Sequence, residues 1–262
     1  MSDYLLDQEE QPRLAAQAAR LDPVTFRRLH ELGVGAGWRC LEVGGGTGSV
    51  AGWLRERVGE RGHVVVTDVE TRWLAALAWP NLEVRQHDIT VDPVEPDSYD
   101  LIHARLVLMH LPDPEAVLAK LIAALHPGGW LLVEEADWHS TVVCHPPSPA
   151  WTRVFEAVSA ALESAGQDLA AGRRLPAALT AAGLTDIAAE GTLFPMPVPE
   201  LGQLVLPLVD RVREQVLGSG VRPGELDEVI GELGDDKSPR WAFSPLLVSA
   251  HGRRARPGPA GV

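Results

Sequence analysis

The sequence predicts an α/β fold of three layers built on a doubly wound parallel sheet. Short apolar runs alternate along the first half of the chain with segments of helical periodicity. The run HVVVT at 63–67 is rich in β-branched residues, as is typical of a strand buried on both faces. Parallel strands require crossover connections, so helices are expected on both faces of this sheet.

Each element follows from local periodicity and from the positions of Gly and Pro. Apolar spacing over 11–32 predicts one or two N-terminal helices, with a break and restart at Asp22-Pro23. Seven strands are expected at 38–43, 63–67, 82–86, 99–104, 130–134, 185–190 and 242–250. Further helices are expected at 49–59, 72–79, 112–125, 149–164, 175–182, 199–217 and 223–233.

These elements predict one domain over residues 1–252. It comprises an N-terminal helical segment (1–37), a core (38–138) and a C-terminal half (139–252). Residues at about 195–240 interrupt the sheet between strands six and seven, and we expect them to form a helical lid. The tail at 253–262 consists mostly of Arg, Pro and Gly and is expected to be disordered.

Composition narrows the classes of partner. The 262 residues carry 23 Lys and Arg against 36 Asp and Glu, a formal charge of −13, which disfavours nucleic acid. Two cysteines indicate neither a disulfide framework nor a metal site. The acidic N-terminus has no secretory pattern, and no apolar run approaches the roughly 20 residues of a membrane span. We therefore expect a soluble cytoplasmic protein, monomeric or homodimeric, with a small-molecule partner.

The stretch 40–48, CLEVGGGTG, is a strand that runs into a glycine turn and then a helix. Glycine permits a positive φ and lets a ligand lie against bare peptide, and the helix N-terminus favours a negative group. A dinucleotide fingerprint requires G-x-G-x-x-G, whereas the spacing here is Gly44-x-Gly46-x-Gly48. This departure disfavours the alternative of a nucleotide-dependent oxidoreductase.

Three carboxylates stand at the ends of the first three strands. Glu42 suits an amine-bearing ligand better than a pyrophosphate. Asp68 is placed to accept hydrogen bonds from ribose hydroxyls, and Asp88 could accept one from an exocyclic amine. Together they suit a nucleoside joined to an amino acid.

Residues 38–135 resemble the Rossmann-like (class I) S-adenosylmethionine-dependent methyltransferases. The resemblance is carried by an ordered series of motifs: LEVGGGTG at 41–48, TDV at 67–69, HDI at 87–89, YDLIHAR at 99–105 and LHPGG at 125–129. The family fold implies seven strands, the last antiparallel, and so places 242–250 between strands five and six.

The resemblance also implies a role for each matched residue. Glu42, Gly44, Gly45, Gly46 and Gly48 would hold the methionine part, Asp68 the ribose, Val69 and Ile89 the two faces of the adenine, and Asp88 its amine, while Ala104 and Arg105 would border the sulfonium. The segment from Tyr4 to Gln17 is similar to the lead segment of small-molecule methyltransferases of natural-product pathways, which implies that Tyr4 contributes to the site.

The implied function is in-line transfer of the methyl group of S-adenosyl-L-methionine to O, N or C of a small molecule, in secondary metabolism. A general base is needed only where the acceptor must lose a proton, and His139, after the fifth strand, is the first candidate. Glu134 and Glu135 should point to opposite faces, so at most one faces the pocket. His103, inside a strand, is expected to be structural.

Two alternatives stay open. The chain could bind the cofactor without transferring its methyl group, as an assembly partner or as a pocket for a rearrangement. The apolar residues Leu204, Leu206, Leu208 and Val209 indicate either an apolar acceptor pocket or a plain packing helix. A nucleic-acid base methylase is disfavoured, because no Asn-Pro-Pro-Tyr motif follows the fourth strand.

Overall fold

The structure is a computed structural model that describes residues 10–140 and 143–256. The chain forms two compact units. The first comprises residues up to 135, 174–190 and from 248 on, and the second comprises 136–173 and 191–247. Among the described residues, no helix combines the length and the apolar character that crossing a membrane would require.

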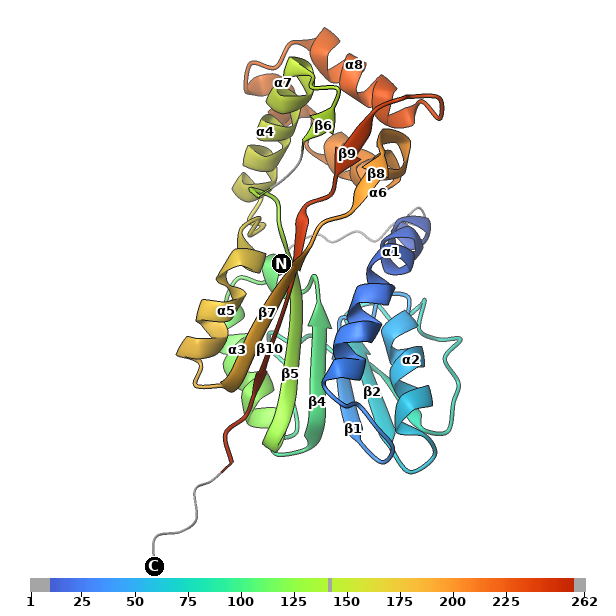
Figure 1. The fold of residues 1–262 in the computed structure, drawn as a ribbon, viewed down its shortest axis with the longest axis vertical. Helices are drawn as coiled ribbons and strands as arrows, with labels where there is room; N and C mark the ends of the chain where they lie inside the picture. Colours follow the sequence, from blue (N-terminus) through green and yellow to red (C-terminus); the bar gives the residue numbers. More distant parts are fainter. Residues whose placement is uncertain (1–9, 141–142, 257–262) are drawn as a thin grey trace, which may run out of the picture. The chain divides into compact units, whose positions relative to one another are not determined.

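A seven-stranded sheet forms the centre of the first unit (Figure 1). Its strands lie in the order β3-β2-β1-β4-β5-β10-β7, and β10 runs antiparallel to its neighbours. The predicted α/β fold is confirmed, including the antiparallel last strand between strands five and six. The strands are β1 (Arg39–Val43), β2 (His63–Asp68), β3 (Leu82–Gln86), β4 (Tyr99–Arg105), β5 (Leu125–Asp137), β7 (Thr185–Thr192) and β10 (Leu246–Arg253).

Helices cover both faces of this sheet. The helices α1 (Glu10–Glu31) and α2 (Ser49–Val58) lie on one face, and α3 (Pro114–Ala124) and α5 (Ala171–Ala181) lie on the other (Figure 1). The short 3-10 helix η1 (Leu108–His110) follows β4. The core between α1, α2 and the sheet consists of fully buried aliphatic side chains, among them Leu29, Leu54, Val66, Leu101 and Leu132.

Two expected helices differ in the structure. Helix α1 continues through Pro23, although an interior proline costs about 3 kcal/mol. Arg105 hydrogen-bonds to Asp22 and to Thr25, and thereby holds the turns on both sides of the proline. The segment 72–79 contains turns at 72–76 instead of a helix, and its leucines Leu74 and Leu77 pack against the glycine loop.

The structure differs from the predicted C-terminal strand and from the predicted disordered tail. The strand predicted at 242–250 divides at Pro245, which cannot donate to a ladder, into β9 (Trp241–Phe243) of the second unit and β10 of the large sheet. The tail predicted to be disordered from Arg253 is ordered at its start. The Arg254 backbone exchanges hydrogen bonds with Gly128 and Gly129 at 2.8 and 2.9 Å, and residues 257–262 lie outside the described part.

The second unit combines a small antiparallel sheet, in the order β6-β9-β8, with four helices. The segment expected to form a lid, at about 195–240, belongs to it together with residues 136–173. A Cβ on Gly202 would lie 2.1 Å from the carbonyl oxygen of Leu233, so glycine permits the close packing of α6 on α8. Besides β9, the elements are β6 (Cys144–His145), β8 (Pro195–Pro197), α4 (Pro149–Ser164), α6 (Val198–Arg211), α7 (Arg213–Gly218) and α8 (Pro223–Gly234).

Candidate cofactor site

The glycine loop is tightly packed on one side and open on the other. The φ angles of Gly44, Gly46 and Gly48 are +69°, +52° and +80°, a region that favours glycine. Added Cβ atoms would meet Val107 at 2.5 Å from Gly44, Val66 at 2.3 Å from Gly45 and Leu77 at 2.3 Å from Gly48. A Cβ on Gly46 would have no atom within 4 Å. The loop therefore leaves room for a ligand at Gly46.

Asp68, at the end of β2, is hydrogen-bonded to this loop. Its Oδ2 accepts a hydrogen bond from the Gly46 amide at 2.9 Å, and its Oδ1 accepts one from the Glu70 amide at 3.0 Å. Burial raises the pKa of this carboxyl group, against the effect of those amides. A carboxylate has about four acceptor positions, so two stay available for the hydroxyls of a ribose.

The predicted adenine residues lie at the ends of β2 and β3. Val69 is an aliphatic side chain with 54 % of its surface exposed, whereas Ile89 is buried. Asp88 accepts hydrogen bonds from the hydroxyl and amide of Thr90 through Oδ1, and these bonds lower the pKa of Asp88. Within the described part of the chain, Oδ2 of Asp88 accepts no hydrogen bond, so Asp88 both caps its turn and keeps one oxygen available to a ligand.

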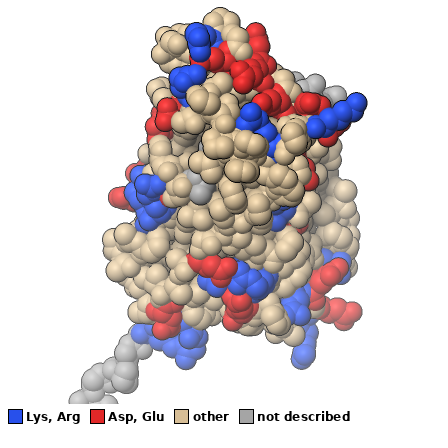
Figure 2. Space-filling model, turned by 45° about the horizontal axis from the view of Figure 1, so that its top comes forward, with Lys and Arg blue, Asp and Glu red and all other residues tan. Residues whose placement is uncertain are grey.

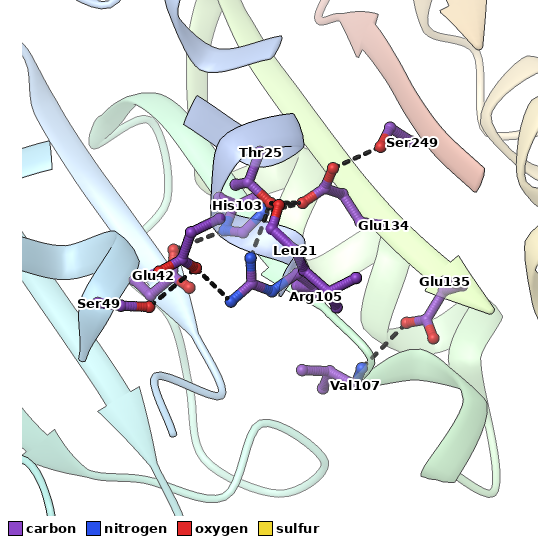
Figure 3. Close-up of polar contacts among 11 residues, drawn as sticks. Leu21, Thr25, Glu42, Ser49, His103, Arg105, Val107, Glu134, Glu135 and Ser249 are labelled. Carbon is purple, nitrogen blue, oxygen red and sulfur yellow. Dashed lines mark hydrogen bonds and ion pairs between the residues drawn. The ribbon is translucent and has the colours of Figure 1, made fainter. Parts of the chain in front are cut away.

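Glu42 belongs to a buried ionic cluster on the face of the sheet covered by α1 (Figure 3). His103 lies opposite Glu42 in the β1–β4 register, and its Nδ1 is 2.7 Å from Glu42 Oε2. Its Nε2 is 3.2 Å from Glu134 Oε2. Burial acts to lower the pKa of His103, but the two carboxylates outweigh it and raise the pKa to about 9. The imidazole is therefore a buried cation at neutral pH.

Arg105, expected to border the sulfonium, is bonded to α1. Its guanidinium donates to Thr25 Oγ1 at 2.8 Å and to Asp22 Oδ1 at 2.9 Å. The hydroxyl of Ser49, the first residue of α2, donates to the same Asp22 oxygen at 3.0 Å. The cluster thus joins α1, α2 and β4, while Ala104 is fully buried within its strand.

Glu135 points away from Glu134, as predicted, and both are fully buried. Glu134 accepts from Thr25 and Ser249, whereas Glu135 Oε1 accepts from the amides of Val107 and Leu108 at 3.0 and 2.7 Å (Figure 3). Burial raises the pKa of Glu135 to about 8, against the effect of these amides. Glu135 therefore holds, in its protonated form, the turn whose Val107 packs against Gly44.

The candidate base His139 lies in the second unit. Its Nε2 is 2.8 Å from Glu163 Oε1, and its backbone amide donates to Asp137. Asp137 also accepts from Ser140 and from Arg173, so it caps this turn. Tyr4, the remaining predicted site residue, lies outside the described residues.

Sequence reasoning missed four polar residues of the buried cluster: Asp22, Thr25, Ser49 and Ser249. The Asp22-Pro23 pair predicts a helix break and gives no sign that Asp22 pairs with Arg105. A period of about four residues places Asp22 and Thr25 on one face of α1, which is a usable signal. Ser249 gives none, because a serine inside an apolar strand identifies no partner.

The chain is similar to known methyltransferases. A family model described as a methyltransferase domain matches residues 8–189. Methyltransferases str2 and str3 of Strobilurus tenacellus are 30 % and 28 % identical over 199 and 195 residues. The matches cover 74 % and 73 % of this chain and 71 % and 69 % of the relatives.

Solved structures show the same fold. A Haemonchus contortus phosphoethanolamine N-methyltransferase 2, solved with S-adenosyl-L-methionine, aligns with a TM-score of 0.59 at 16 % identity. The alignment covers 98 % of this chain and 60 % of that one. The open space at Gly46 and the acceptors of Asp68 and Asp88 fit the same cofactor, which when bound supplies a methyl group already activated on a sulfonium. The chain belongs to the methyltransferase-domain family and is an S-adenosyl-L-methionine-dependent methyltransferase that acts on a small molecule.

Proposed function

We propose that the enzyme methylates O, N or C of a partly apolar small molecule in natural-product biosynthesis. The proposed position of the cofactor is supported by the hydrogen bond from the Gly46 amide to Asp68, beside the open space at Gly46. In this proposal Asp68 binds the ribose, Val69 and Ile89 flank the adenine and Asp88 accepts from its amine. The methionine part lies between Glu42 and the loop.

The second unit supports an apolar acceptor. On α6, Val209 is buried, whereas Leu204, Leu206 and Leu208 keep part of their surface exposed. Partly exposed leucines on a helix suit contact with an apolar ligand. The residues expected to form the lid thus supply apolar surface beyond what packs against α8.

The charge distribution supports an acceptor other than nucleic acid. On the face shown in Figure 2, Lys and Arg are interspersed with Asp and Glu instead of forming one basic stripe. The formal charge of −13 acts in the same direction, because binding to a phosphate backbone depends on clustered cations.

His139 is the base in this proposal when the acceptor must lose a proton. The contact between its Nε2 and Glu163 fixes the ring and leaves Nδ1 to act on the acceptor. His139→Ala should then lower kcat for a phenol and leave kcat for a neutral amine unchanged. Equal kcat values for His139→Ala and the wild type on both acceptors would show that His139 is not the base, and would leave the proposed methyl transfer unaffected.

The test of the function is a panel of apolar phenols, secondary amines and enolisable ketones incubated with methyl-labelled cofactor. We expect labelled product and S-adenosylhomocysteine in equal amounts with at least one acceptor class. Tight cofactor binding with no S-adenosylhomocysteine from any acceptor would favour a binding protein without transfer. The Asp68→Ala variant is the matched control, because it should lose cofactor affinity.

A further inference from the structure

The buried cation His103 has a role that the cofactor assignments do not include. The side chain is fully buried and contacts one carboxylate on each side, Glu42 of β1 and Glu134 of β5. Among the described residues, neither carboxylate forms a hydrogen bond or ion pair with another cationic side chain. The imidazolium is therefore the cation that directly contacts both carboxylates.

The two carboxylates differ in their second oxygen. Both oxygens of Glu134 are in use, because Ser249 donates to its Oε1, and Thr25 and His103 contact its Oε2. Glu42 contacts His103 through Oε2, and its Oε1 has no hydrogen-bond partner within residues 10–140 and 143–256. The cluster thus presents one unused carboxylate oxygen, two residues before the glycine loop.

Burial disfavours the charged form of a carboxylate, and a neighbouring cation offsets that cost. The His103 imidazolium, 2.7 Å from Glu42 Oε2, is such a cation and fixes the direction of the Glu42 carboxylate. Glu134 in turn holds the other ring nitrogen, so that the imidazole cannot rotate.

We propose that His103 is a positioning residue that holds the Glu42 carboxylate in place, so that Glu42 Oε1 receives the ammonium group of the cofactor's amino-acid part. This inference rests on the proposed function, in which Glu42 binds that part. It assigns no contact between His103 and the cofactor. Its prediction concerns the amino-acid part alone.

Two ligands separate this role from a general structural one. S-adenosylhomocysteine carries the amino-acid part, and 5′-methylthioadenosine carries the same nucleoside thioether without it. Calorimetric titration of both into the wild type, His103→Gln and Glu42→Gln measures the contribution of the ammonium contact. In both variants we expect a loss of about tenfold or more in affinity for S-adenosylhomocysteine, equivalent to about 1.4 kcal/mol, and unchanged affinity for 5′-methylthioadenosine.

Each other outcome has a defined meaning. Equal losses for both ligands in His103→Gln would assign His103 to the fold alone and overturn the inference. A selective loss in Glu42→Gln but not in His103→Gln would keep the role of Glu42 and overturn that of His103. Failure of the wild type to bind S-adenosylhomocysteine would instead contradict the proposed function.

Replacing the fully buried His103 can also disturb the fold. A second measurement therefore uses the wild type. Nitrogen NMR of the wild-type imidazole near neutral pH should show both ring nitrogens protonated. A neutral ring would overturn the inference, since a neutral imidazole donates from one nitrogen only and so cannot hold both carboxylates. Glu228→Gln, which replaces an exposed glutamate of α8, is the charge-matched control for the titrations.

Discussion

Replacing Glu135 by Gln should remove a strong pH dependence of stability. Glu135 is fully buried, and its Oε1 accepts hydrogen bonds from the amides of Val107 and Leu108. Within the described residues, its Oε2 has no hydrogen-bond partner. Glutamine keeps the shape and the accepting oxygen but cannot ionise. The substitution therefore isolates the cost of the buried charge.

The magnitude follows from the pKa in the two states. The pKa of a glutamate in the unfolded chain is 4.5, and burial raises that of Glu135 to about 8. Between these values the unfolded chain has released the proton that the folded chain retains, so the free energy of unfolding falls as pH rises. The difference corresponds to about 5 kcal/mol, which is lost progressively from about pH 4.5 to about pH 8. Below that range both states are protonated and no loss arises.

The assay is urea unfolding of both proteins across this pH range. Other titrating groups, His103 included, are common to both proteins, so the difference between the two free energies of unfolding isolates Glu135. We expect Glu135→Gln to gain stability relative to wild type as pH rises, and Glu228→Gln, an exposed control, to follow wild type. Parallel curves for wild type and Glu135→Gln would refute the reasoning, because they would show that Glu135 ionises freely in the folded state.

Three other substitutions test the loop and the cluster. Gly48→Ala should cost about 1–3 kcal/mol in chemical unfolding, because the residue has a φ of +80° and its Cβ would lie 2.3 Å from Leu77. The control Gly52→Ala, within α2, should instead stabilise the protein by up to about 1 kcal/mol. Asp68→Asn should weaken cofactor binding by about tenfold or more in calorimetry with an unchanged circular dichroism spectrum; unchanged affinity would contradict the ribose assignment. Arg105→Gln should speed amide hydrogen exchange in α1 and cost about 1–3 kcal/mol of unfolding free energy, because Asp22 loses its buried partner. The control Arg27→Gln, which breaks an exposed pair, should cost at most about 1 kcal/mol. Equal hydrogen exchange in the two variants would contradict the anchoring role of Arg105.

Sequence reasoning performed best where a local pattern is enough. The run at 63–67 forms a buried strand, and the glycines of the loop adopt the positive φ angles that such a turn needs. It performed worst where a distant contact decides the outcome. Pro23 lies inside a continuous helix because Arg105, 82 positions later in the chain, bonds the residues around it. No window of local sequence contains that contact.

The same limit applies to the candidate site. The ends of parallel strands meet at one edge of a sheet, so the sequence could place Asp68 and Asp88 near the glycine loop. It could also predict that Glu134 and Glu135 point to opposite sides, because successive side chains of a strand alternate. It could not predict that Arg105 pairs with α1, because either role fits an arginine at a strand end. That assignment required Asp22, a residue of another element.

Glu134 and Glu135, buried at adjacent positions of β5, have pKa values shifted in opposite directions. Glu134 lies beside a protonated imidazole and two hydroxyl donors, and these outweigh the burial that would raise its pKa. Glu135 accepts hydrogen bonds from backbone amides, and these do not outweigh burial, to which the neighbouring charge of Glu134 adds. The imidazolium of His103 thus lies on the face covered by α1, where Glu42 is the proposed partner of an ammonium group. The opposite face receives an uncharged carboxyl group that fixes Val107 over the glycine loop, so each face supports the loop by a different chemistry.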